Sequence, residues 1–170
     1  MNRVKSGYRV SDSEWIRICN PEVNESLAAF GDIAEVNRNS PDWLKEIIAG
    51  MDRCCAHEFD LYPHWHFIDS PNDKGERIGF IFIENKHAVG MSIFYQPFAH
   101  KVWYMSGIWI IPSARRMNVL TKHSRFLWEK FGYDFSVVYP LSEGVKAWIK
   151  QSEWAPCWLY NIDWKTGEFI

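Results

Sequence analysis

The sequence lacks most features that mark membrane, secreted or zinc-stabilised proteins. None of its apolar runs approaches the ~18 residues needed to span a bilayer, and its first ten residues, MNRVKSGYRV, contain no apolar segment of signal-peptide length. The four cysteines are Cys19, the adjacent Cys54 and Cys55, and Cys157, a spacing that fits neither a zinc ribbon nor a disulfide framework. We therefore expect a soluble cytoplasmic protein with reduced thiols and no membrane partner.

Strong net charge is also missing. The formal net charge is −2, so no global field attracts nucleic acid or a membrane surface. The 170 residues contain no repeat, no low-complexity tract and no long linker, which predicts a single domain over residues 1–170. Aromatic residues, in contrast, are abundant, with ten Trp and eleven Phe. They suit either a core built from large rings or stacking surfaces for flat substrates such as nucleobases.

Local patterns predict alternating strands and helices. In the first half they indicate a strand over residues 8–19, a helix from Asn20-Pro21 to about residue 34, and a second helix after Ser40-Pro41-Asp42. In the second half they indicate strands at 77–84 and 87–95 joined by an Asn85-Lys86 turn, a buried central strand at 101–111, a helix starting near residues 114–117 and ending near Phe131, a strand at 135–139, a helix at 142–152 and a strand at 157–164. This order predicts an α/β fold with one mixed, twisted sheet flanked by helices.

The segment after the central strand carries a family resemblance. It reads Gly107-Ile108-Trp109-Ile110-Ile111-Pro112-Ser113-Ala114-Arg115-Arg116, followed by Met117-Asn118-Val119-Leu120. This succession resembles the GNAT N-acetyltransferase superfamily, in which an apolar fourth strand leads through an [RQ]-x-x-G-x-[GA] loop into a helix that holds the pyrophosphate of coenzyme A. Backbone N–H groups at a helix N-terminus favour such an anion. Asn118 and Leu120 occupy the two glycine positions.

The resemblance implies a cofactor and a set of binding residues. It predicts acetyl-CoA or another acyl-CoA as cofactor, bound by Ile110, Ile111, Arg115, Arg116, Met117, Asn118, Val119 and Leu120. It covers roughly residues 76–154. The Tyr that the family often places in its last helix has no counterpart, because that register holds Trp148-Ile149.

Candidate catalytic groups are few. Amine acylation needs a neutral amine and benefits from an acid that protonates the leaving thiolate. The predicted central strand contains no carboxylate, and its hydroxyls, Tyr104 and Ser106, suit structural roles. Tyr139, at the end of the next strand, and Ser142, before the following helix, are the remaining catalytic candidates; Ser142 also suits a helix cap.

Two further clusters suggest other ligands. His57, His64 and His66 suggest a metal, and His64 and His66 would share one face of a strand, but no third ligand at a fixed spacing is evident, so we expect no metal site. Arg115, Arg116, Lys122 and Arg125 form a local basic patch that suits either solvated helix charge or phosphates of coenzyme A or nucleic acid.

The sequence thus favours a GNAT-like acyltransferase that moves an acetyl or other acyl group from an acyl-CoA to an amine of a small molecule, protein or nucleic acid. One alternative is an enzyme similar to the Mom-type DNA-modification proteins of bacteriophages, which would hold a flipped base on its Trp-rich surface. The other is a non-catalytic binding or viral protein that keeps the fold.

Overall fold

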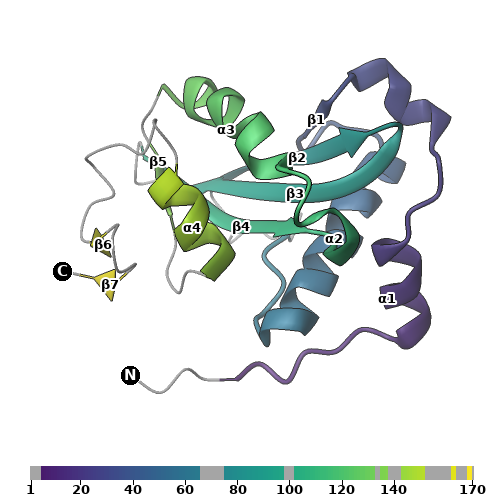
Figure 1. The fold of residues 1–170 in the computed structure, drawn as a ribbon, viewed down its shortest axis with the longest axis horizontal. Coiled ribbons are helices and arrows are strands. Elements are labelled where there is room, and N and C mark those ends of the chain that lie inside the picture. Colours follow the sequence, from purple (N-terminus) through teal and green to yellow (C-terminus); the bar gives the residue numbers. More distant parts are fainter. Residues whose placement is uncertain are drawn as a thin grey trace.

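The chain forms a mixed α/β fold built on one five-stranded sheet (Figure 1). The computed structural model describes residues 5–65, 75–97, 102–132, 135–137, 143–151, 162–163 and 168–169. The sheet has the order β1-β2-β3-β4-β5, and its strands are β1 (Ile33–Val36), β2 (Glu76–Glu84), β3 (His87–Gln96), β4 (Trp103–Ile110) and β5 (Phe135–Val137). Neighbours are antiparallel except β4 and β5, which are parallel. The α/β class with a mixed sheet predicted from the sequence is therefore confirmed.

In the described part of the chain, four α-helices and two 3₁₀ turns accompany the sheet. The helices are α1 (Asp12–Cys19), α2 (Asp42–Phe59), α3 (Val119–Lys130) and α4 (Glu143–Gln151); the turns are η1 (Glu25–Phe30) and η2 (Pro112–Ala114). A separate short pair is formed by β6 (Ile162–Asp163) and β7 (Glu168–Phe169). β6 falls within the strand predicted at 157–164, most of which lies outside the described residues.

The first 36 residues differ from the prediction. The expected strand at 8–19 is wrong, because residues 12–19 form α1, whose start is capped by Ser11 accepting the Glu14 N–H at 3.2 Å. The helix expected after Pro21 is also wrong: only the 3₁₀ turn η1 forms, and Gly31, at φ 71°, ends it before strand β1. In both places a local cap decided the structure against the apolar pattern.

From α2 onward the predicted order holds. α2 starts directly after Pro41, and Asn85 and Lys86 form the β2–β3 turn with φ values of 49° and 64°, as a two-residue hairpin requires. β4 lies inside the sheet, between β3 and β5. The helix predicted from residues 114–117 begins later, at Val119, because Asn118 takes the left-handed conformation with φ 56° and cannot belong to an α-helix.

The two faces of the sheet are packed by different helices. Gly79 lies against Ile48 of α2, whereas the neighbouring Phe80 packs edge-on against Phe126 and Phe131 at the end of α3. Because side chains alternate along a strand, α2 and α3 cover opposite faces. The α3 face holds a cluster of aromatic rings: Phe80, Phe94, Trp128, Phe131 and Phe135. These rings belong to the core, which favours a structural explanation for them over stacking platforms.

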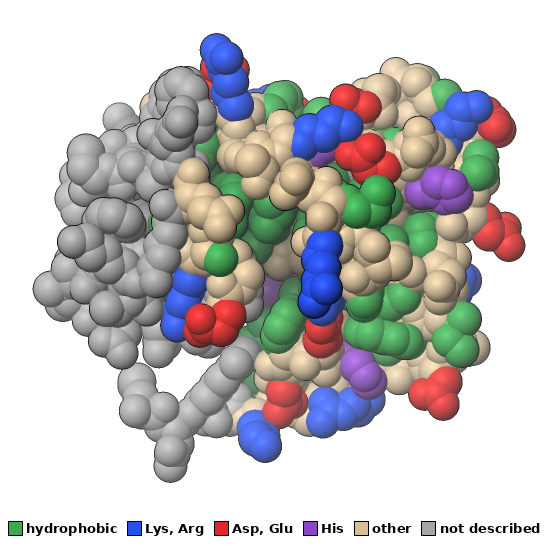
Figure 2. Space-filling model, in the orientation of Figure 1, with side chains coloured by type: hydrophobic (Ala, Val, Ile, Leu, Met, Phe, Trp, Pro, Cys, Tyr) green, Lys and Arg blue, Asp and Glu red, His purple; other side chains and the backbone are tan. Residues whose placement is uncertain are grey.

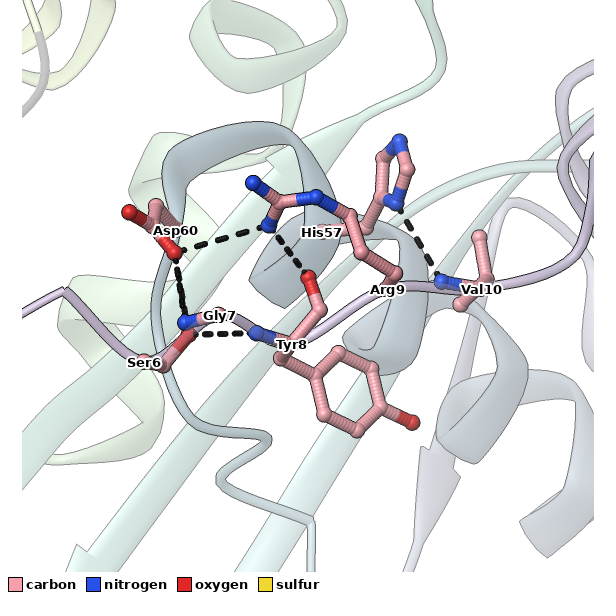
Figure 3. A network of polar contacts seen from close by, with 7 residues as sticks. All are labelled: Ser6, Gly7, Tyr8, Arg9, Val10, His57 and Asp60. Atoms are coloured by element: carbon pink, nitrogen blue, oxygen red, sulfur yellow. Dashed lines mark hydrogen bonds and ion pairs between the residues drawn. The ribbon is translucent and has the colours of Figure 1, made fainter.

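An N-terminal segment, residues 5–10, is tied to the C-terminal end of α2 (Figure 3). Asp60, which ends the helix in the left-handed conformation at φ 55°, accepts hydrogen bonds from the Gly7 N–H at 2.9 Å and the Ser6 hydroxyl at 3.3 Å. The Val10 N–H donates to Nδ1 of His57 at 3.2 Å. Hydrogen bonding by Gly7 holds the pKa of Asp60 below its usual range. These contacts place α1 beside the last turn of α2, next to the site described below.

One carboxyl group is buried in the middle of α2. Asp52 is 1% exposed and its Oδ2 accepts the Trp65 N–H at 2.7 Å. Burial raises its pKa to about 6, although hydrogen bonds from the backbone of Trp65 and His64 oppose the rise. The folded protein therefore binds this proton more tightly than the unfolded chain does. The associated stability is present in full below pH 3.8 and is lost as the pH rises to about 6.

We expect Asp52→Asn to remove this pH dependence. The variant keeps an oxygen that accepts the Trp65 N–H and has no charge to bury. The free energy of unfolding of the wild type, measured in urea relative to that of the variant, should fall by about 2–3 kcal/mol between pH 4 and pH 7. Glu22→Gln, at an exposed position, is the control and should leave the wild-type profile unchanged. If the difference in unfolding free energy between the wild type and Asp52→Asn did not vary with pH, this would contradict a buried carboxyl that ionises in this range.

Candidate ligand-binding cavity at the edge of strand β4

Strand β4 has two different edges. Along β3 it is paired from Tyr104 to Ile110, with a bulge at Ser106, which has no partner because Met105 faces Phe94 and Gly107 faces Ile93. Along β5 the described pairs stop at Met105 and Val137. The β5 side of the later part of β4 therefore has no described ladder partner. Bulges of this kind often lie beside active sites because they redirect the strand.

A cavity of about 710 Å³ opens along that edge. Its walls come from four elements: residues 108–110 of β4; Ala114, Arg115 and residues 118–121 at the start of α3; residues 143–145, Ala147, Trp148 and Gln151 of α4; and Phe59 of α2. The volume is within the range typical of small-molecule sites. Most of the lining is apolar, and the charged side chains in it are Arg115 and Glu143.

The start of α3 offers backbone donors to this cavity. The Lys122 N–H donates to the Asn118 carbonyl at 2.9 Å, which leaves the N–H groups of residues 119–121 ahead of the helical hydrogen-bond ladder. Asn118 makes no side-chain cap. The positive end of the helix dipole lies at the same place. The cavity therefore combines a long apolar edge with one end suited to an anion.

A carboxylate from α2 fixes the position of two cavity residues. Glu58 accepts hydrogen bonds from the Trp109 indole at 2.7 Å and from both terminal nitrogens of Arg115, one of them at 2.7 Å. Arg115 also donates through Nε to the Ile110 carbonyl at 3.0 Å. Burial raises the pKa of Glu58, but the hydrogen bonds from Arg115 and Trp109 outweigh it and hold the pKa below its usual range. Glu58 is thus ionised at neutral pH and fully engaged.

Aromatic rings support Trp109 from the side of α1. The rings of Trp15 and Trp109 pack edge-to-face, with their centroids 6.2 Å apart. The ring centroids of Trp15 and His57 are 5.3 Å apart. His57 also accepts the Val10 N–H from the N-terminal segment. A continuous set of contacts therefore runs from the N-terminal segment through α1 and the end of α2 to the cavity wall.

The predicted cofactor residues divide into two groups. Ile110, Arg115, Asn118, Val119 and Leu120 line the cavity. Ile111, Arg116 and Met117 do not: Ile111 is buried and its N–H donates to the Val89 carbonyl at 3.0 Å, whereas Arg116 and Met117 are exposed.

The catalytic candidates are mostly outside the part that can be placed. Tyr139 and Ser142 both lie outside the described residues. Of the β4 hydroxyls, Ser106 donates to the Ile93 carbonyl at 3.4 Å, in agreement with a structural role.

Three of the four basic-patch residues are paired with carboxylates. Arg115 is paired with Glu58, Lys122 with Glu84 and Asp32, and Arg125 with Glu129. Figure 2 shows acidic side chains beside basic ones across this face rather than one basic field. The patch therefore has a much weaker field than its sequence suggests.

Metal ligands do not gather in the described part of the chain, where no group of three His, Cys, Asp or Glu side chains is placed to hold an ion. His57 is occupied by the Val10 N–H, and His66 lies outside the described residues. None of the described helices is both long enough and apolar enough to cross a bilayer.

Comparison with known proteins gives no relative: no protein-family model matches the chain, and no curated protein matches it significantly.

Several cavity residues escaped sequence reasoning. Glu58 and Phe59 lie on α2, and Glu58 precedes Trp109 by 51 residues. Only because α2 crosses β4 does Glu58 contact Trp109 and Phe59 line the cavity. In the sequence, the α4 wall is marked only by Trp148-Ile149, which stand where the family has its Tyr. No local pattern marks Glu58, because a Glu in the last turn of a helix is ordinary.

We expect Glu58 and Arg115 to stabilise the fold as a coupled pair. A double-mutant cycle with Glu58→Ala and Arg115→Ala should give a coupling energy of about 1–2 kcal/mol in urea unfolding, because the pair is two-pronged and partly buried, with side-chain exposures of 23% and 37%. The exposed pair of Arg125 and Glu129 is the control and should give only about 0.3–0.5 kcal/mol. Equal coupling in the two cycles would show that the Glu58 network is ordinary surface charge.

Proposed function

We propose that the chain is a GNAT-like acyltransferase that binds an acyl-CoA in the cavity beside β4 and transfers the acyl group to an amine. The observation that carries this proposal is the cavity itself, which joins the β5-side edge of β4 to the N-terminus of α3. A ligand with an anionic end and a long, largely neutral arm fits both features at once.

The architecture supports the same family. From β1 onward the chain runs strand, helix, three antiparallel strands, helix, parallel strand, helix. From α2 onward this agrees with the element order on which the resemblance rests. Before α2 it does not, because α1, η1 and β1 stand where one strand and one helix were expected.

The residues present fit coenzyme A in several respects. The N–H groups of residues 119–121 would meet the pyrophosphate. Asn118, at one of the two glycine positions of the family motif, takes the left-handed conformation, which glycine adopts without strain. Arg116 is exposed close to this turn and would add a cation. Leu120, the second replaced glycine, lines the cavity as an apolar wall. Bound acyl-CoA would supply the activated thioester.

The charges around the cavity limit how the proposed acyl transfer would proceed. The amine nitrogen attacks the thioester carbon, a C–N bond forms and the C–S bond breaks; the thiolate takes one proton, and an ammonium acceptor releases a second to solvent. Glu58 is a weak base because Arg115 and Trp109 hold its lone pairs. Glu143, the carboxylate in the described lining, is 90% exposed. Catalysis here would rest on positioning, so the acceptor is a weakly basic or neutral amine rather than an ordinary lysine side chain.

The nucleic-acid alternative has less support. Its basic patch is mostly compensated by carboxylates, and many aromatic rings expected to hold bases are in the core. A non-catalytic binding role remains compatible with the same cavity and is separated from the proposal by the experiment below.

We expect Thr121→Glu to abolish coenzyme A binding without harming the fold. Thr121 is exposed and lines the cavity in the first turn of α3. A carboxylate there stabilises the helix end but repels a pyrophosphate. By calorimetry, acetyl-CoA affinity should fall at least ~10-fold in Thr121→Glu, whereas the uncharged Thr121→Gln should change it less than ~3-fold.

The same experiment includes a positive reference and its contradiction. At ~100 times its dissociation constant, acetyl-CoA should add about 2.7 kcal/mol to the stability of the wild type. Failure of coenzyme A and acyl-CoA alike to bind would refute the proposal. Binding without transfer to any amine would favour the non-catalytic role.

A further inference from the structure

Glycine 107 differs from the other glycines of the central sheet. A Cβ built on Gly79 would lie 2.1 Å from Ile48, and one on Gly90 would lie 2.4 Å from Ile110 and 2.8 Å from the Trp109 carbonyl. At Gly90 the backbone contact excludes a side chain, and at Gly79 the Ile48 and Trp65 side chains would have to shift. A Cβ on Gly107 would meet only ordinary contacts among the described residues, the nearest being Ile93 at 3.6 Å. No contact with a described residue therefore requires glycine at position 107.

Glycine in a strand has a cost that needs a reason. It destabilises a strand relative to alanine, and in a strand it often marks a bulge or the close approach of a ligand or of another backbone segment. Gly107 is half-buried, directly follows the bulged Ser106, and precedes Ile108, where the cavity lining begins. It also lies two residues beyond the last described pair with β5.

The location matches the far end of a ligand anchored at α3. From Ile111 back to Gly107 the strand rises on the order of 13 Å. A ligand held by its phosphates at residues 119–121 and extended along β4 therefore reaches Gly107 with the end opposite the phosphates. In an acyl-CoA that end is the acyl group.

We propose that Gly107 is a specificity-determining residue, whose missing side chain makes room for an acyl group larger than acetyl. This inference rests on the proposed acyl-CoA function. The chemical class it assigns is a bulky acyl thioester, with a ring or a branch next to the carbonyl, lying against the β4 backbone at the bulge.

Calorimetry with acetyl-CoA and benzoyl-CoA tests the inference. The wild type should bind benzoyl-CoA at least as tightly as acetyl-CoA. Gly107→Ala should lower the affinity for benzoyl-CoA by ~10-fold or more, since one added methyl group in a fitted pocket changes affinity by about this factor. It should lower the affinity for acetyl-CoA by less than ~3-fold. Its melting temperature should equal or exceed that of the wild type.

Gly90→Ala is the matched control for the structural argument. It adds the same methyl group on the neighbouring strand, where the Cβ meets backbone, and its melting temperature should fall.

Three results would overturn the inference. The first is a wild type that binds acetyl-CoA ~10-fold more tightly than benzoyl-CoA. The second is a Gly107→Ala variant that binds both thioesters more weakly by the same factor, and the third is a loss of stability in Gly107→Ala like that in Gly90→Ala. The first needs no variant. If neither thioester nor free coenzyme A binds the wild type, the proposed function fails, and this inference fails with it.

Discussion

The arrangement of the site depends on how β4 divides its hydrogen bonds. β4 is held by β3 along nearly all its length, but its described parallel pairing with β5 covers three residues, from Trp103 to Met105. The bulge at Ser106 follows immediately. Backbone N–H and C=O groups at a strand edge need partners, and here the edge borders a cavity rather than another described strand. The proposed extended ligand would find space and polar backbone groups along this part of the edge.

Electrostatics assigns different tasks to the two ends of the cavity. At the α3 end, N–H groups and the helix dipole favour an anion, but the nearest lining cation, Arg115, is already neutralised by Glu58. Anion binding would thus depend on backbone groups and on Arg116 more than on Arg115. Glu58 instead acts as a brace: it orients Trp109 and keeps Arg115 against the Ile110 carbonyl. Such a brace holds the cavity walls in place before any ligand arrives, which lowers the ordering cost of binding.

Sequence reasoning succeeded where the signal was local and strongly periodic. The α2 start, the Asn85-Lys86 hairpin, the central position of β4 and the helix after it were all predictable, because each combines a start or turn signal with a matching apolar pattern. The expected burial of β4 holds only in part, since five of its eight residues are partly exposed. It failed at residues 8–34, where capping by Ser11 and the left-handed Gly31 outweighed weak apolar patterns. It also placed the start of α3 too early, because the conformation of Asn118 is not visible in composition.

The cavity was predictable only on one side. The cavity residues in β4, in the start of α3 and between them were predictable, because the loop that joins a strand to the following helix borders the predicted ligand site. Glu58 could not, because its role arises from a contact between elements distant in sequence. That contact also bears on the proposed acyl transfer. A carboxylate whose pKa is lowered by an arginine and an indole gains little by accepting a further proton. This half-buried acid beside β4 is therefore poorly suited to deprotonate an ammonium ion. In the proposed acyl transfer, that favours an acceptor whose nitrogen is already neutral.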